Sequence, residues 1–286
     1  MSDSTSGKIT FGIVTDTQFA DADPKPPNYF RASAAKLGKC IADFNSKNLD
    51  FIINLGDTID HKLSSFDPIL EEFKAAKAPV HHLLGNHDFD VEPEECLLVP
   101  ALMDIPGPPY YRSFSVADWR FVFLDGNELS LVAYPPDSEA HIRSQAYFDE
   151  FAKAGPTNAE RYNGAVGDQQ LDWLETELEQ ASAADQKVLI FNHFPTLPIS
   201  THSLWDAEKL ADMLERHPCV RAHVNGHFHR GSYVRRNGVH YLTLKAMLET
   251  PDTVTYSVAE LENNQLTIRG MGNQPDYILD LSSTGN

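Results

Sequence analysis

Five short polar motifs follow five apolar runs along the chain, and their order constrains the fold more than any other feature. The runs have the length and composition of short buried strands and lie at residues 9–15, 51–55, 80–84, 188–191 and 220–225. The motifs that end them are Asp16-Thr17-Gln18, Gly56-Asp57, Gly85-Asn86-His87-Asp88, Asn192-His193 and Gly226-His227-Phe228-His229. We therefore expect these polar groups where strands end and loops begin, which is where α/β folds place their chemistry.

The motifs contain seven side chains of the kinds that bind divalent metal ions. They are two carboxylates, two amides and three imidazoles: Asp16, Asp57, Gln18, Asn86, His193, His227 and His229. Seven ligands are too many for one ion, but if one carboxylate bridges they suit two ions roughly 3.5–4 Å apart. Oxygen and imidazole ligands without a thiolate favour Mn²⁺, Fe or Zn²⁺. Glycine precedes Asp57, Asn86 and His227, where it lets the backbone turn tightly and approach the ions closely.

These motifs resemble those of the calcineurin-like metallophosphoesterase superfamily, whose members carry D-x-H, G-D, G-N-H-D or G-N-H-E, an isolated His and G-H-x-H in this order. The first motif departs from that pattern, because Gln18 stands where most members have histidine. Asp-x-Gln followed by Phe-Ala-Asp at 19–21 is similar to the manganese-dependent ADP-ribose/CDP-alcohol diphosphatase subfamily. Residues 124–130 and 248–250 resemble the same subfamily.

The resemblance implies two metal ions that share the carboxylate of Asp57. The first ion is bound by Asp16, Gln18, Asp57 and His229, and the second by Asp57, Asn86, His193 and His227. His87 binds no metal in this scheme and faces the scissile phosphorus. Because Gln18 supplies a harder oxygen in place of a nitrogen, the first site is expected to favour Mn²⁺ or Mg²⁺ over Zn²⁺.

A hydrolytic mechanism follows from the charges of such a centre. Two divalent ions less two carboxylates leave a positive charge that attracts a phosphate oxygen and activates a bridging hydroxide as the nucleophile. His87 is expected to stabilise charge on phosphorus or to protonate the leaving oxygen, and Asp60 or Asp88 to orient an imidazole. No covalent enzyme intermediate is required.

Composition excludes several other classes of protein. A chain of 286 residues that is 42% hydrophobic is expected to form one domain over residues 1–286. No run approaches the ~20 apolar residues of a membrane span. Residues 1–8 are polar rather than a secretory signal, so we expect a cytoplasmic protein without membrane insertion. Cys40, Cys96 and Cys219 lie far apart and predict buried, reduced thiols.

The net charge of −18 argues against polyanionic partners. A binder of nucleic-acid polymers needs a basic face, and anionic membranes would be repelled too. A small phosphate ester remains compatible, because the metal ions supply positive charge locally. An arginine cluster flanks the last motif, and it either steers such an anion or is solvated surface: Arg221, Arg230, Arg235 and Arg236.

Alternating strand and helix patterns predict an α/β (α+β) sandwich of two packed mixed β-sheets flanked by helices. Helical periodicity is present at 32–45, 66–77 and 169–180. Antiparallel strands are expected at 238–244, 253–259 and 265–269, with a turn at Asn263-Asn264. Residues 127–166 lack clear periodicity and are expected to form an inserted, lid-like segment.

A second candidate for substrate binding is the segment 21–31, which follows the first metal motif. Tyr29 and Phe30 are candidates for stacking on a base, and Arg31 for binding a phosphate. Plain packing is the alternative for each aromatic. The resembling diphosphatases carry a longer, more arginine-rich segment at this position.

Three functions remain open from the sequence. The leading hypothesis is hydrolysis of a phosphodiester or diphosphate bond in ADP-ribose, a CDP-alcohol or a cyclic nucleotide. The second is a phosphomonoesterase, or a phosphodiesterase for glycerophospho or lipid head-group esters, with the same metal centre and a different pocket. The third is a non-catalytic metal-binding scaffold, which the intact Asn86 and His87 disfavour.

Overall fold

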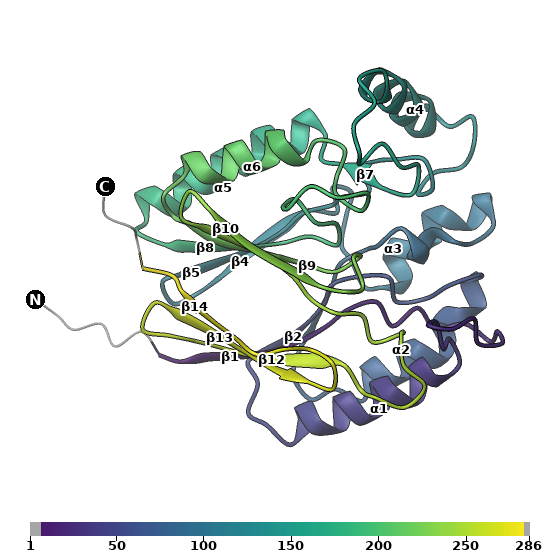
Figure 1. Ribbon diagram of the computed structural model, residues 1–286, viewed down its shortest axis with the longest axis horizontal. Helices are drawn as coiled ribbons and strands as arrows, with labels where there is room; N and C mark the ends of the chain where they lie inside the picture. Colours follow the sequence, from purple (N-terminus) through teal and green to yellow (C-terminus); the bar gives the residue numbers. More distant parts are fainter. Residues whose placement is uncertain (1–6, 283–286) are drawn as a thin grey trace, which may run out of the picture.

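Two six-stranded β-sheets pack face to face in the computed structural model, which describes residues 7–282 (Figure 1). The first sheet has the order β14-β13-β12-β1-β2-β3. Three of its strands are parallel: β1 (Ile9–Val14), β2 (Phe51–Asn54) and β3 (Val80–His82). The other three are antiparallel to their neighbours: β12 (Tyr256–Glu262), β13 (Gln265–Met271) and β14 (Tyr277–Asp280). The sheet is therefore mixed, as predicted.

The second sheet has the order β10-β11-β9-β8-β5-β4. Its four inner strands are parallel: β11 (Val239–Thr243), β9 (Val220–Asn225), β8 (Lys187–Phe191) and β5 (Trp119–Phe123). Its two edge strands are antiparallel: β10 (Ser232–Arg236) and β4 (Arg112–Val116). The prediction of purely antiparallel pairing after residue 238 is thus wrong for β11, which also pairs in parallel with β9.

Helices cover the outer face of each sheet, as Figure 1 shows. The first sheet is covered by α1 (Ala32–Asn45) and α2 (Phe66–Lys74). The second is covered by α5 (Asp168–Ala183) and α6 (Ala207–Arg216). The predicted sandwich is confirmed. The helix predicted over 66–77 ends earlier, at Lys74.

The core between the sheets is rich in phenylalanine. Alternate residues of a strand point to the same face, so each strand can direct its apolar side chains into this core. On β1, Phe11 and Ile13 face the second sheet, and both are buried. The Phe11 ring lies 5.0 Å from that of Phe51 in its own sheet and 5.8 Å from that of Phe121 in the other. Each such side chain contributes about 1.5–3 kcal/mol by leaving water, so this packing fixes how the two sheets meet.

The segment 127–166 contains regular structure that its sequence pattern did not indicate. A short pair, β6 (Leu129–Ser130) with β7 (Gly164–Ala165), encloses the helix α4 (Glu139–Ala152). Only Ser144 and Phe148 of this helix are buried, so its apolar stripe is too narrow to give a clear period.

Short helical turns complete the chain, and several of them lie near the strand ends. They are η1 (Leu63–Ser65), η2 (His87–Phe89), η3 (Pro93–Leu98) and α3 (Val99–Leu102). The three cysteines are free and buried, as predicted. Within residues 7–282, no helix has the length and apolar character needed to cross a membrane. Most of the polar start at 1–8 lies outside the described residues.

Candidate metal centre

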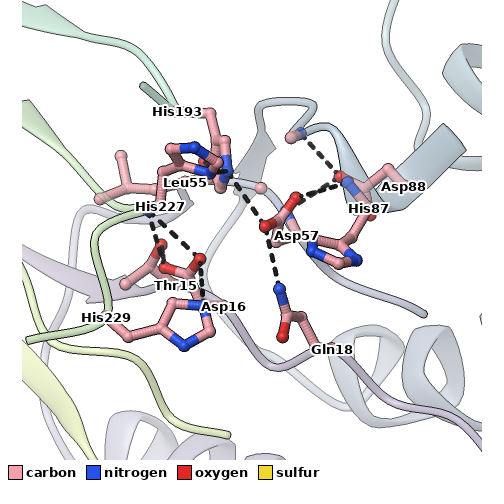
Figure 2. A network of polar contacts seen from close by, with 12 residues as sticks. Thr15, Asp16, Gln18, Leu55, Asp57, His87, Asp88, His193, His227 and His229 are labelled. Carbon is pink, nitrogen blue, oxygen red and sulfur yellow. Dashed lines mark hydrogen bonds and ion pairs between the residues drawn. The ribbon is translucent and has the colours of Figure 1, made fainter. Parts of the chain in front are cut away.

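The five polar motifs meet at one edge of the sandwich, at the carboxyl ends of β1, β2, β3, β8 and β9 (Figure 2). The two sheets contribute different chemistry. Turns of the first sheet carry the candidate oxygen ligands: Asp16, Gln18, Asp57 and Asn86. Turns of the second carry only imidazoles: His193, His227 and His229. The centre therefore lies across the join between the sheets.

Asp57 lies at the middle of this arrangement and is fully buried. Its Oδ2 is 3.2 Å from Nε2 of His193 and 3.1 Å from Nε2 of Gln18. Its Oδ1 accepts the backbone N–H of His87 at 2.8 Å. Burial would raise the pKa of the Asp57 carboxyl, but His193 and His87 lower it well below its usual range. The carboxylate is thus ionised and central, as a bridging ligand must be.

Asp16 occupies the other side of the centre and is also fully buried. Its Oδ1 is 3.5 Å from Nε2 of His229, and both of its oxygens are 3.2 Å from the backbone N of His227. The Thr15 hydroxyl donates to Oδ2 at 2.6 Å. The first and last motifs are thereby joined, although 211 residues separate Asp16 from His227.

Each of the three histidines directs one ring nitrogen away from the centre to an acceptor. His193 Nδ1 is 2.9 Å from the carbonyl of Leu55, and His227 Nε2 is 3.0 Å from Oδ1 of Asn163. His229 Nδ1 is 3.3 Å from Oε1 of Glu249. Such contacts fix the tautomer and orientation of metal-binding imidazoles. They leave His193 Nε2 and His227 Nδ1 facing each other at 3.2 Å, beside Asp57.

Asn163 and Glu249 were not predicted as site residues. Asn163 comes from the inserted segment, and Glu249 from the loop after β11. Asn163 lies in the segment without clear periodicity, and Glu249 in a stretch that resembles the subfamily. Neither directly follows an apolar run, as the candidate ligands do. Their roles depend on contacts made by the folded chain.

Asn86 provides a direct test of whether the residues fit metal ions. Its side chain is 8% exposed, and its Oδ1 is buried without a hydrogen-bond partner. Such an atom is free to accept a bond from a group outside the chain, as are Oδ1 of Asn127 and Oδ1 of Asn225, but Asn86 alone of these three lines the cavity. Carboxylate, amide and imidazole groups suit Mn²⁺, Fe or Zn²⁺, so the residues fit the predicted ions.

Asp60 and Asp88 have different roles, which the sequence left open. Oδ2 of Asp60 lies 3.5 Å from Nδ1 of His87. Asp88 instead accepts backbone N–H groups of Gly85, Asp57 and Thr58 at 2.8, 3.0 and 2.7 Å. It joins the second and third motifs. Burial would lower the pKa of His87, but the Asp57 and Asp60 carboxylates raise it to about 9.

Several ligands have strained backbone conformations. Asp16, Asp57 and His227 have φ values of 51°, 52° and 64°, a region that costs side-chain-bearing residues about 1–3 kcal/mol each. At Gly85, a Cβ atom would lie 2.0 Å from Oδ1 of Asp57. Only glycine allows this approach, which supports the predicted reason for a glycine before Asn86.

A cavity of about 990 Å³ opens over the centre. Its floor includes Gln18, Asp57, Asn86, His227 and His229. One wall is largely apolar and is formed by residues of 89–96 and 131–136. The other wall combines aromatic and charged groups: Tyr162, His202, Phe228, Arg230 and Glu249. The space is much larger than one phosphate group requires.

The segment that contains Tyr29, Phe30 and Arg31 does not reach this cavity. Phe30 is 3% exposed and packs with Ala20 and Leu248. Arg31 forms ion pairs with two exposed carboxylates, Asp21 and Asp23. None of the three residues lines the cavity, so the geometry gives no support to their predicted substrate contacts.

Comparison with known proteins agrees with the geometry. A model of the calcineurin-like phosphoesterase family matches residues 9–231. The chain is 31% identical to a manganese-dependent ADP-ribose/CDP-alcohol diphosphatase of Arabidopsis thaliana, over 92% of this chain and 94% of that protein. The Homo sapiens protein of the same name is 26% identical, over 98% and 95% of the two chains.

A solved structure shares the whole architecture. The crystal structure of a dimetal phosphatase from Danio rerio superimposes with a TM-score of 0.85 at 26% identity, covering 96% of this chain and 99% of that one. The matched family model spans all five motifs, from Asp16 to His229. The chain is a metallophosphoesterase that belongs to the calcineurin-like phosphoesterase family and, within it, to the family of manganese-dependent ADP-ribose/CDP-alcohol diphosphatases.

Proposed function

We propose that this chain uses two metal ions to hydrolyse the diphosphate or phosphodiester bond of a small nucleotide-type substrate, such as ADP-ribose, a CDP-alcohol or a cyclic nucleotide. The observation that carries the proposal is the cluster of seven candidate ligands that includes Asp57, five of which line a cavity of about 990 Å³. The names of the relatives support the same substrate class.

The residues divide into two overlapping sets of ligands. Asp16, Gln18, Asp57 and His229 would hold one ion, and Asp57, Asn86, His193 and His227 the other. Two divalent ions bound there, Mn²⁺ by preference, would supply positive charge for a phosphate oxygen and would lower the pKa of a water molecule that serves as the nucleophile. The unpartnered Oδ1 of Asn86 supports this assignment.

His87 acts on the substrate from the side of the cavity. Its Nδ1 is directed to Asp60, which leaves Nε2 for the scissile phosphate. The carboxylates of Asp57 and Asp60 raise the pKa of His87 and so favour the protonated ring. It can therefore offset negative charge on the phosphate and donate its Nε2 proton to the leaving oxygen.

Arg230 is suited to the second phosphate of a diphosphate. Among the described residues that line the cavity it is the only lysine or arginine, and its guanidinium makes no ion pair within residues 7–282. Arg236 of the same predicted cluster is instead committed to Glu208 and Glu215. In a chain of net charge −18, an arginine that lines the cavity would favour an anion there, although its charge is partly offset by the nearby carboxylate of Glu249.

The inserted segment 127–166 serves as a wall of the substrate site in this proposal. It supplies Leu131, Val132, Tyr134 and Pro136 to the apolar side and Tyr162 to the aromatic side. The apolar side suits the uncharged part of a substrate, and Tyr162 with Phe228 suits a base. These lining residues support the lid-like role predicted for the segment.

The test is a substrate panel on metal-stripped protein to which Mn²⁺ is restored. ADP-ribose and CDP-choline should be hydrolysed fast, ahead of bis-p-nitrophenyl phosphate and p-nitrophenyl phosphate.

Because hydrogen bonds to charged groups contribute about 1.5–3 kcal/mol, Arg230→Gln should raise the KM for ADP-ribose about tenfold or more. It should leave bis-p-nitrophenyl phosphate unaffected. Arg235→Gln, an exposed arginine that does not line the cavity, is the matched control.

Other outcomes of the panel would select the other functions. A preference for p-nitrophenyl phosphate would indicate a phosphomonoesterase with the same metal centre. A preference for glycerophospho esters would indicate a head-group phosphodiesterase. Two bound ions with no turnover of any substrate would indicate a scaffold and overturn the proposal.

A further inference from the structure

Glu249 lies outside the five motifs, yet its carboxylate contacts a predicted metal ligand. Its Oε1 is 3.3 Å from Nδ1 of His229, whereas Nε2 of the same ring is 3.5 Å from Oδ1 of Asp16. The imidazole is therefore held between two carboxylates, of which only Asp16 belongs to the ligand set. A metal-binding histidine usually donates its second N–H to a carboxylate or carbonyl, which fixes the ring and makes it a stronger ligand.

His229 differs in this respect from the other two histidines of the centre. His193 has a backbone carbonyl as its outer acceptor, and His227 has the amide oxygen of Asn163. Both acceptors are neutral. A charged acceptor increases the electron density of the ring more than a neutral one. His229 is also less buried than His193 and His227.

The backbone that carries Glu249 is bonded to both ends of the metal centre. The N–H of Met247 donates to the carbonyl of Thr15 at 3.2 Å, and the N–H of Leu248 to that of Asp16 at 3.0 Å. The N–H of Ala246 donates to the carbonyl of His229 at 3.1 Å. These bonds use the N–H groups of the segment and leave its carbonyl oxygens for other donors.

Lys36 of α1 donates hydrogen bonds to three carbonyl oxygens of this segment. Its Nζ donates to the carbonyl oxygens of Met247, Leu248 and Thr250, the last two at 3.3 and 2.7 Å. The side chain is 2% exposed, and within residues 7–282 it makes no ion pair. Burial lowers the pKa of Lys36 to about 8. A buried ammonium is unfavourable unless its donors are satisfied, so this contact has a specific structural task.

We propose that Glu249 is a positioning residue for the metal ligand His229, and that Lys36 holds Glu249 in place by binding the carbonyl groups of residues 247, 248 and 250. The inference rests on the two-metal centre proposed above. One metal site would then depend on α1, a helix that contributes no ligand.

Calorimetric titration of metal-stripped protein with Mn²⁺ tests the proposal without measuring turnover. Wild-type protein should bind two ions. Glu249→Ala should weaken one binding step about 10–100-fold and leave the other unchanged. Glu249→Gln, which keeps an acceptor oxygen, should recover part of the loss. Lys36→Met should weaken the same step, although Lys36 contacts no ligand.

Controls separate positioning from general loss of stability. Lys39→Met changes an exposed lysine of the same helix, and Glu262→Gln an exposed glutamate of β12, and both should bind Mn²⁺ as wild type does. The unfolding temperature of each metal-free variant is recorded beside the titration. Glu249 is half-buried, so its variants should fold even if Lys36→Met does not.

Two results would overturn the proposal. One is unchanged binding of both ions by folded Glu249→Ala. The other is equal weakening of both steps together with a lower unfolding temperature, which would mean a purely structural role. If wild-type protein itself fails to bind two ions, the result contradicts the proposed two-metal centre. It is then distinguishable from both results that overturn the role of Glu249.

Discussion

The two sheets of the sandwich make unequal contributions to the metal centre. The first carries the four proposed oxygen ligands in turns after β1, β2 and β3, and the second carries the three proposed imidazole ligands in turns after β8 and β9. Neither set could hold two ions alone, because each proposed site takes ligands from both sheets. The site therefore depends on the packing between the sheets, which the phenylalanine core provides.

The two halves also differ in how their ligands are supported. The oxygen half is held by backbone contacts, such as those of Asp88 with Gly85, Asp57 and Thr58. In the imidazole half, His193 also has a backbone partner, the carbonyl of Leu55, but His227 and His229 depend on the side chains of Asn163 and Glu249. Substitutions in the two halves should therefore have distinguishable effects.

The largest effect is expected from Asp57→Asn, because this carboxylate belongs to both proposed ligand sets. Turnover should fall to the level of metal-free protein, and Mn²⁺ titration should show that both binding steps are lost. His193→Ala, in the imidazole half, should remove only one step. If Asp57→Asn kept one tight site, Asp57 would not be the bridge.

His87→Ala should have the next largest effect. This residue lies in the oxygen half but is not a ligand, so both Mn²⁺ binding steps should remain. Loss of its proton transfer and charge stabilisation should lower kcat about 10²–10⁴-fold. Steady-state kinetics with ADP-ribose would measure this. Full turnover by the variant would contradict the role given to His87.

Asn163→Ala removes the outer acceptor of His227 and tests the imidazole half. Its effect should be a 10–100-fold weaker Mn²⁺ affinity at one site, roughly as for other second contacts of metal ligands. Its amide also donates to the carbonyls of Asn158 and Thr201, so the unfolding temperature should fall. Asn163→Asp keeps an acceptor oxygen and should retain more affinity. Equal affinities in all three proteins would show that this contact is unimportant.

Gln18→His makes the oxygen half resemble the imidazole half and should have the smallest effect. A nitrogen ligand at this position is expected to shift the preference of the first site toward Zn²⁺, by roughly tenfold in the ratio of Zn²⁺ to Mn²⁺ affinity. Competition titration of the two metals would measure the shift. An unchanged ratio would mean that Gln18 does not set metal preference.

Much of this protein could be predicted because its candidate metal ligands follow local sequence patterns. Each ligand follows an apolar run within a few residues, so strand prediction alone brought Asp16, Asp57 and His193 to strand ends. The helix at 32–45 had a clear apolar stripe and was predicted with its observed bounds. The helix α4 lacked one, since few of its residues are buried, and it was missed.

The contacts that support and surround the ligands depend on the tertiary structure. Asn163 is 64 residues from His227, and Lys36 is 214 residues from Thr250, so no local pattern relates them. Packing also directs Phe30 into a buried cluster and Arg31 to exposed carboxylates, away from the cavity. Strand periodicity and ligand chemistry are local properties, so the fold class and the candidate metal-binding groups could be predicted from the sequence. Only the packing of the two sheets decided which distant side chains support those groups, because such contacts form only when the hydrophobic core brings the segments together.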